Sequence, residues 1–227
     1  MTMKRTLFPL LLALMTTLSV RAQIPYMAET VGNGYFYAYT SVKFRPGHNA
    51  MENYTNIAYG IGNHMQVGLD LYLSGIGQPS IDWGYTFRFN AFSSNYFSIG
   101  GQETVFFNLL DSHRFKTNQF MLILSGSFTP NGRFKWTSNT FWYWARSGEH
   151  TFEQNWNIGY NFALGEKGGN LCPMIGCAHS WQFEQVPTPA AGLVYNYKWL
   201  FAYLWCDRWF SEDPRVVIGL EFIIPTI

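Results

Sequence analysis

The side chains in this sequence that could act on a solute are charged and amide groups placed at alternate positions of otherwise apolar segments. The set consists of Asp70, Asp82, Arg88, Glu153, Asn155 and Glu221, with Gln66, Thr86 and Asn157 at further alternate positions. Since side chains alternate across a β-strand, these groups would all face one interior while their neighbours face outward. Charged and amide groups around a passage select small solutes by charge and by hydrogen bonding. We therefore expect these residues to line a lumen.

Two interpretations of this lumen are open. In the first it is a selective passage for small polar solutes. In the second the same groups form an internal network of salt bridges and hydrogen bonds that fills a narrow barrel. A barrel of about twelve strands has more interior than side chains readily fill, which favours the passage. Within the set, four acidic residues stand against Arg88, so we expect a preference for cations or neutral polar solutes over anions.

A catalytic site is not indicated by the sequence. The candidate pairs are His179 with Ser180 and His150 with Glu153. Adjacent residues on a strand point to opposite faces, so His179 and Ser180 would not meet as base and nucleophile. No GxSxG, HExxH or phosphate-loop motif occurs. Metal-ligand spacing is also missing among the histidines of the predicted connections, His48, His64 and His113. We expect no enzyme, metal or cofactor.

The three cysteines are Cys172, Cys177 and Cys206, and none has CxxC or CxxH spacing. An odd count leaves at least one thiol free even in an oxidising compartment. Cys172 and Cys177 would face opposite sides of one regular strand, so a bridge between them needs a turn or a bulge. We interpret all three as small apolar residues.

The predicted lumen residues lie on segments that have the pattern of β-strands with one apolar face. In the segment 65–74 that face is formed by Met65, Val67, Leu69, Leu71 and Leu73. Segments 80–90 and 151–163 repeat the pattern, and 215–224 does so less cleanly. Apolar-out, polar-in strands of about 9–11 residues are what a membrane-spanning barrel requires. The pattern predicts an all-β fold, a transmembrane antiparallel up-and-down β-barrel.

About twelve strands are predicted, at 34–44, 53–61, 65–74, 80–90, 95–107, 118–128, 133–145, 151–163, 171–183, 190–197, 199–209 and 215–224. Tight connections rich in Gly, Asn, Pro or Ser follow the second, fourth, sixth and eighth strands, as expected for short periplasmic turns that alternate with longer outer loops. The segment 195–199 has almost no turn signal, and Pro173 removes a strand hydrogen bond, so a later start or a bulge is expected there. Ten strands is the alternative.

Composition excludes several other classes of protein. Aromatic residues make up 19% and charged residues 13% of the chain, whereas a soluble domain is about one quarter charged. After Val20 no stretch approaches the roughly 18 apolar residues of a membrane helix. The net charge is +1 with no basic run, so no nucleic-acid partner is indicated. Trp136 and Trp144 share one face at a spacing that would reach both interfacial aromatic bands.

The N-terminus has the three parts of a secretory signal peptide. Lys4 and Arg5 precede the apolar run 7–20, and small residues lead to Ala22. We therefore expect a signal peptide at 1–22 and the barrel domain at 23–227. The apolar run is short for a retained membrane helix, which needs about 20 residues.

The run 56–71 resembles a hairpin of small Gram-negative outer-membrane barrels. It is similar to the transporter family associated with phenol-degradation pathways, with Tyr59-Gly60 at the strand end, a tight turn, and then Val67-Gly68-Leu69-Asp70-Leu71. The resemblance covers about one hairpin, with general similarity over 215–225, and it implies a passive channel or uptake role for small molecules. Such barrels usually end on an aromatic residue, whereas this chain ends on Ile227, so the expectation is either that Phe222 serves instead or that the chain uses a divergent signal.

The sequence thus predicts a bacterial outer-membrane β-barrel that acts as a channel or transporter for small polar or neutral solutes. Its expected partners are outer-membrane lipid and a small-molecule solute, and both a monomer and an oligomer are compatible with the pattern. The alternative is a non-conducting barrel with a structural or surface-interaction role. An outer-membrane barrel enzyme comes third.

Overall fold

The structure is a computed structural model that describes residues 27–46, 50–75, 80–111, 114–165, 168–182, 186–210 and 214–226. The predicted signal peptide at 1–22, and the loop residues His48 and His113, lie outside the described residues. No helix in the described part of the chain is long and apolar enough to cross a membrane.

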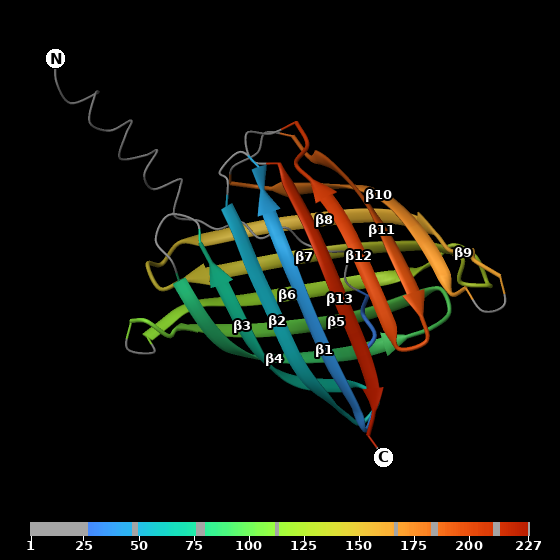
Figure 1. The fold of residues 1–227 in the computed structure, drawn as a ribbon, viewed down its shortest axis with the longest axis horizontal. Coiled ribbons are helices and arrows are strands. Elements are labelled where there is room, and N and C mark those ends of the chain that lie inside the picture. Colours follow the sequence, from blue (N-terminus) through green and yellow to red (C-terminus); the bar gives the residue numbers. More distant parts are fainter. Residues whose placement is uncertain are drawn as a thin grey trace.

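The described chain forms one antiparallel sheet that closes on itself (Figure 1). Its strands are β1 Tyr35–Arg45, β2 Ala50–Ile61, β3 Met65–Ser74, β4 Ser80–Ser93, β5 Phe97–Asn108, β6 Arg114–Ser127, β7 Phe134–Ala145, β8 His150–Tyr160, β9 Phe162–Ala163, β10 Asn170–Ser180, β11 Thr188–Tyr197, β12 Leu200–Asp207 and β13 Arg215–Pro225. β1 pairs with β13, with Tyr39 opposite Glu221, and this pairing closes the barrel. β9 continues the line of β8, since both pair with β10. The predicted twelve-stranded barrel is confirmed, and the ten-strand alternative is wrong.

The two ends of the barrel differ in their connections. We call the end that holds the turn 62–64, the turn 198–199, the start of β1 and the end of β13 the turn end. The opposite end, where β3, β10 and β12 end and β4, β11 and β13 begin, is the loop end. This alternation of shorter and longer connections agrees with the pattern expected from the sequence.

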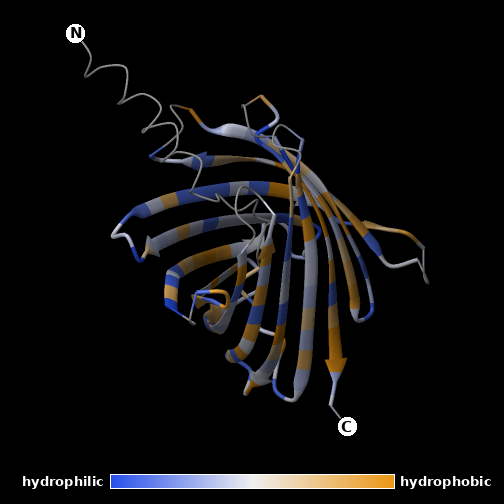
Figure 2. Ribbon diagram, turned by 60° about the vertical axis from the view of Figure 1, so that its left-hand side comes forward, coloured by the Kyte–Doolittle hydropathy of each residue, from blue (hydrophilic) through white to orange (hydrophobic). Residues whose placement is uncertain are grey.

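Alternate residues of each strand face the lipid side and the interior. In β3, Leu69 is 65% exposed while the next residue, Asp70, is 4% exposed. The same alternation runs around the wall as bands of opposite hydropathy along the strands (Figure 2). Because the outward side chains are apolar and have no protein to cover them, the outer surface suits contact with lipid tails.

Aromatic side chains gather on the outer surface near both ends of the barrel. At the turn end, Trp136 stacks on Phe97 with ring centroids 6.0 Å apart. At the loop end, Trp144 stacks on Trp142 with centroids 5.4 Å apart. The two tryptophans that the sequence analysis singled out therefore belong to opposite aromatic bands, where amphipathic rings meet a membrane interface.

The strand boundaries differ from prediction at three places that matter for the interior. β2 begins at Ala50 and β6 at Arg114, earlier than the predicted 53 and 118. The predicted strand 151–163 is interrupted at Asn161, which separates β8 from β9. Pro173 lies opposite this interruption, between Leu171, which pairs with β9, and Met174, which pairs with β8. Proline has no backbone N–H group to donate, and its position therefore coincides with an interruption of the hydrogen bonds between strands, as expected.

Candidate functional site

All predicted lumen residues face the interior, but they lie at three different levels. Asp82 and Glu153, near the starts of β4 and β8, lie toward the loop end. Asp70 is near the middle of the wall, and Arg88 and Glu221 lie toward the turn end. The others on the inner wall are Gln66, Thr86, Asn155 and Asn157. The structure therefore does not assemble the predicted set into one ring.

Asp70 is fixed by hydrogen bonds from three neighbouring side chains. Tyr54 and Thr86 donate their hydroxyl groups to its carboxylate, and Asn56 Nδ2 donates to Oδ1 at 3.0 Å. Thr86 also shares a hydrogen bond of 3.0 Å with Thr104. A carboxylate that accepts several hydrogen bonds is stable in its charged form inside the barrel. Asp70 is therefore held against the wall rather than left open to a passing solute.

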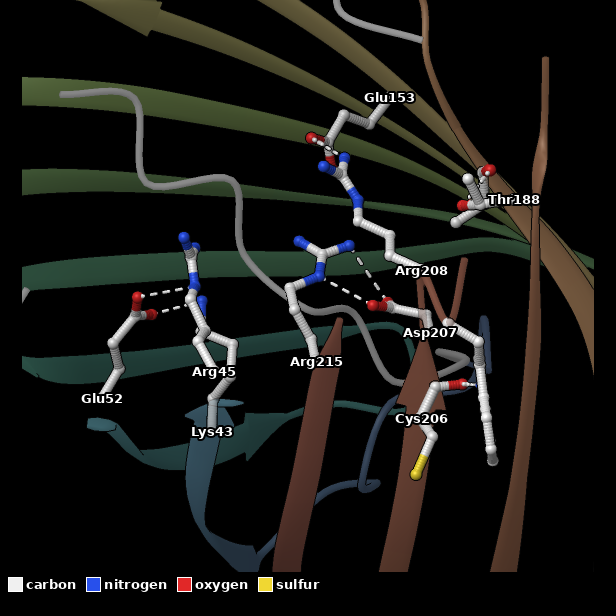
Figure 3. Close-up of polar contacts among 11 residues, drawn as sticks. Lys43, Arg45, Glu52, Glu153, Thr188, Cys206, Asp207, Arg208 and Arg215 are labelled. Atoms are coloured by element: carbon white, nitrogen blue, oxygen red, sulfur yellow. Dashed lines mark hydrogen bonds and ion pairs between the residues drawn. The ribbon is translucent and has the colours of Figure 1, made fainter. Parts of the chain in front are cut away.

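A cluster of ion pairs, which we call the loop-end cluster, lines the interior near the loop end (Figure 3). One pair, with two parallel hydrogen bonds, joins Arg215 at the start of β13 to Asp207 at the end of β12. The guanidinium donates through Nε to Oδ1 at 2.7 Å and through a second nitrogen to Oδ2 at 3.1 Å. Both side chains are 1% exposed. Two parallel bonds of this kind give both energy and a defined geometry.

A second part of the loop-end cluster surrounds Glu52 on β2. Lys43 forms an ion pair with its carboxylate, and Arg45 Nε lies 3.3 Å from Oε1. Tyr72 donates its hydroxyl group to the same carboxylate. These basic side chains reach inward from β1, next to Arg215 on the paired strand β13 (Figure 3).

The predicted lumen acids Asp82 and Glu153 also have basic partners. Lys116 Nζ lies 2.5 Å from Asp82, and an Arg208 guanidinium nitrogen lies 3.6 Å from Glu153. Arg208 follows the inward Asp207 directly, yet it also faces inward because its φ of 58° interrupts the strand alternation. For that reason Arg208 was not among the predicted lumen residues.

The expected excess of acids in the lumen is wrong for the described residues. From the alternation alone, Lys116 falls in a predicted connection and Arg208 at a predicted strand end, which leaves Arg88 as the one predicted lumen cation. The structure adds further inward basic side chains, namely Lys43, Arg45, Lys116, Arg208 and Arg215, and further inward acids, namely Glu52 and Asp207. The interior wall is therefore close to balanced in charge, and the predicted preference for cations loses its basis.

The chain before β1 lies inside the barrel. We call residues 27–31 the luminal segment, drawn in dark blue behind β13 in Figure 1. Ala28 is fully buried, its amide donates to Ser125 Oγ at 2.9 Å, and its carbonyl accepts from Asn90 Nδ2 at 3.0 Å. Arg88 donates to the carbonyl of Met27. Side chains of the wall thus satisfy the backbone of this segment, as buried peptide groups require.

Two inward glycines make room for the backbone next to the luminal segment. A Cβ at Gly100 would lie 2.8 Å from the carbonyl oxygen of Ala28, and one at Gly60 would lie 1.7 Å from the carbonyl oxygen of Gly32. Any larger residue at these positions would collide with the chain as it enters the barrel. The wall is therefore shaped to receive this part of the chain.

A cavity of about 240 Å³ remains beside the luminal segment at the turn end. Its wall combines charged and amide groups with aromatic and apolar side chains, among them Arg88, Lys135, Asn161, Asn196, Tyr203 and Glu221. Tyr203 donates its hydroxyl group to Glu221. Three of the predicted lumen residues, Gln66, Arg88 and Glu221, thus line one cavity. The predicted set did not include Lys135, Asn161 and Asn196, because single polar residues near strand ends form no motif.

The alternative catalytic pairs do not assemble. Ser180 is opposite Glu153 on the inner wall, whereas the ring of His179 lies edge-on to Trp181 at 4.7 Å. His150 is exposed and Glu153 is buried. No group of three His, Cys, Asp or Glu side chains that could hold a metal occurs among the described residues. Cys172, Cys177 and Cys206 are all free thiols, which confirms that at least one is unpaired.

Comparisons with known proteins identify the fold. No protein-family profile and no curated protein matches the sequence, so the resemblance to the phenol-pathway family is not confirmed. The structure is similar to KdgM porin in complex with disordered oligogalacturonate, with a TM-score of 0.60 and 12% identity over 82% of this chain and 98% of that one. It is also similar to an outer-membrane channel from Pseudomonas putida F1, with a TM-score of 0.55 and 10% identity over 89% and 100%. At these identities the likeness shows the fold alone, which is that of bacterial outer-membrane β-barrels.

Proposed function

We propose that this protein is an outer-membrane channel for small polar or neutral solutes. The observation that carries the proposal is a closed barrel with an apolar outer face and an inner wall of charged and amide groups. Such a wall lets a solute exchange its water for protein hydrogen bonds while lipid is kept out. The balanced charge of the wall supports neutral and zwitterionic solutes rather than one sign of ion.

The structural neighbours support this proposal by analogy of fold. The similar structures are porins and a channel, and one was determined with an oligogalacturonate. One fold can host several functions, so the polar interior of this chain is what supports a passage. The solute passes the turn-end cavity, where the luminal segment narrows the barrel.

A non-conducting barrel is the second candidate, and one observation favours it. The luminal segment fills part of the interior, and buried ion pairs such as Asp207–Arg215 tie the loop-end side chains to one another. If the segment never leaves, the barrel serves as a structural or surface protein. The two candidates differ in whether solutes cross the intact protein.

Solute entry into proteoliposomes separates the candidates. Vesicles that contain the purified protein are diluted into solutions of glycine, glucose or a trisaccharide, and swelling is followed by light scattering. A channel gives swelling that is fast for glycine and slower as the solute grows, while vesicles with heat-denatured protein stay unchanged. Swelling no faster than in protein-free vesicles for every solute would support the filled barrel.

The proposed function also requires export of the chain across the inner membrane. We propose that residues 1–22 are removed as a signal peptide, so that the mature protein begins at Gln23. Mass spectrometry of the protein from the outer-membrane fraction tests this boundary. A mass that retains 1–22, or recovery from the soluble periplasmic fraction, would contradict it.

A further inference from the structure

The turn-end cavity contains a cation that the protein itself leaves unpaired. Lys135 on β7 lines the cavity, and among the described residues its ammonium group forms no hydrogen bond or ion pair. The other charged groups of this wall are engaged. Arg88 donates to a carbonyl of the luminal segment, Glu29 accepts from a serine, and Glu221 accepts from a tyrosine.

An unpaired ammonium group in this setting attracts an anion. Lys135 is half-buried, so it keeps part of its water. The effective dielectric constant in the cavity is still lower than in bulk water, so an ion pair there gains more energy than one on an open surface. The free group at Lys135 therefore favours a ligand with one negative charge.

Two amide side chains of the same cavity are also available to form hydrogen bonds with a ligand. Asn196 Oδ1 is buried and has no hydrogen-bond partner among the described residues. Asn161 lies two residues beyond Gly159, and Gly159 is paired with Lys135 across β7 and β8. Because an amide can turn to offer either its oxygen or its NH₂ group, both residues can bind a polar group of a ligand close to the ammonium.

The other side chains that line the cavity are suited to contact with the apolar part of a ligand. Met174, Val194, Phe201 and Ile223 contribute side chains to the wall. The volume of about 240 Å³ is below the roughly 300–1,000 Å³ of sites for drug-sized ligands. It therefore fits a compound of about one ring with a short polar group.

We propose that the turn-end cavity is a binding site for small monocarboxylates with an apolar body, in which Lys135 holds the carboxylate. The inference rests on the proposed function, because the site lies on the path of a solute through the barrel. It replaces the expected preference for cations with a local preference for organic anions at this level of the lumen.

Equilibrium binding to the purified mature protein in detergent tests the site. Cyclohexanecarboxylate is compared by titration calorimetry at pH 7 with its neutral isostere cyclohexanecarboxamide and with acetate, which lacks the apolar body. We expect cyclohexanecarboxylate to bind at least about tenfold more tightly than either, since each comparison removes one class of contact. Equal binding of the carboxamide would overturn the role of charge, and equal binding of acetate would overturn the role of the apolar body.

Variants of Lys135 test whether this residue binds the carboxylate of the ligand. Lys135→Gln should weaken binding of cyclohexanecarboxylate by about tenfold or more, while Lys135→Arg, which keeps the charge, should stay within about threefold of wild type. Lys116→Gln is the matched control, because Lys116 pairs with Asp82 near the opposite end of the barrel. Heat-dependent gel migration confirms that each variant is folded. Unchanged binding by folded Lys135→Gln, or no saturable binding to wild type, would overturn the proposal.

This measurement is independent of conduction. A protein that binds cyclohexanecarboxylate but does not let solutes cross a membrane contradicts the proposed channel and leaves the site intact. A protein that conducts but does not distinguish the carboxylate from the carboxamide contradicts the site and leaves the channel intact.

Discussion

The backbone amide of Ala28 donates a hydrogen bond of 2.9 Å to Ser125 Oγ, and this contact holds the chain before β1 against β6 inside the barrel. Ala28 is fully buried there, between Asn90, which binds its carbonyl, and Gly100, which leaves room for it. The lumen at this level is therefore partly occupied by the chain itself. How much passes through the barrel depends on whether this segment stays in place.

Displacement of the luminal segment should widen the passage. In Ala28→Trp the large ring has no room at a position that is 0% exposed, so the segment should leave its place while the wall keeps its pairing. We expect a single-channel conductance at least about twofold above that of wild type. The control is Asn131→Trp, which adds the same ring at an exposed turn of the same end. Equal conductance in the two variants would mean that the segment does not limit flow.

The outward face of β3 should be sensitive to charge. Leu69→Arg places a basic group in the lipid-facing wall, which costs about 2–4 kcal/mol of unfolding free energy near the middle of a bilayer. Leu69→Phe keeps the surface apolar and should change stability by less than about 1 kcal/mol. Asp70→Asn should also cost only about 1 kcal/mol, because the amide oxygen still accepts a hydrogen bond. Urea unfolding from lipid vesicles measures all three.

The order of these effects tests the assignment of faces. If Leu69→Arg were no more harmful than Asp70→Asn, the outward and inward sides of β3 would be reversed. Such a result would also disagree with the difference in exposure between Leu69 and Asp70 in the structure.

Replacing only one partner of the Asp207–Arg215 ion pair should lower the stability of the barrel more than replacing both. Arg215→Met leaves Asp207 buried without its bidentate partner, and the loss of unfolding free energy should be about 3–5 kcal/mol. The double variant Asp207→Asn/Arg215→Met removes both charges and should recover a large part of that loss. Urea unfolding of the two variants gives the comparison. A double variant as unstable as Arg215→Met would show that the charge of Asp207 is not the cause.

Sequence alternation was sufficient to predict the wall of the barrel. Strands such as 65–74 combine an apolar side with a polar side, so the number of strands and the inward direction of Asp70 and Arg88 followed from a period of two residues. The same rule failed where the backbone leaves the extended region. Lys198 and Arg208 have φ angles of 54° and 58°, which a non-glycine residue rarely adopts. The turn at Lys198 and the inward direction of Arg208 were therefore not predictable.

The partners of the lumen acids were missed for a different reason. Glu52 and Lys116 precede the apolar runs of β2 and β6. Glu52 belongs to its strand because it pairs with Ser74 on β3, and Lys116 lies at an irregularity of β6, between Phe115 and Thr117, which pair with β5. The luminal segment was also missed, since the sequence shows Gly60 and Gly100 only as residues that weaken strands. These glycines leave room for the chain that lies inside the barrel, and that tertiary contact cannot be predicted from one sequence.

Single-channel recording in planar bilayers tests the central proposal most directly. The account predicts discrete conductance steps for the wild-type protein in 1 M KCl, with larger steps for Ala28→Trp. In a salt gradient the bulk charge selectivity should be weak, because acidic and basic side chains are nearly balanced along the inner wall. A folded, membrane-inserted protein that gives no steps, either as wild type or as Ala28→Trp, would contradict the channel and establish the filled barrel in its place.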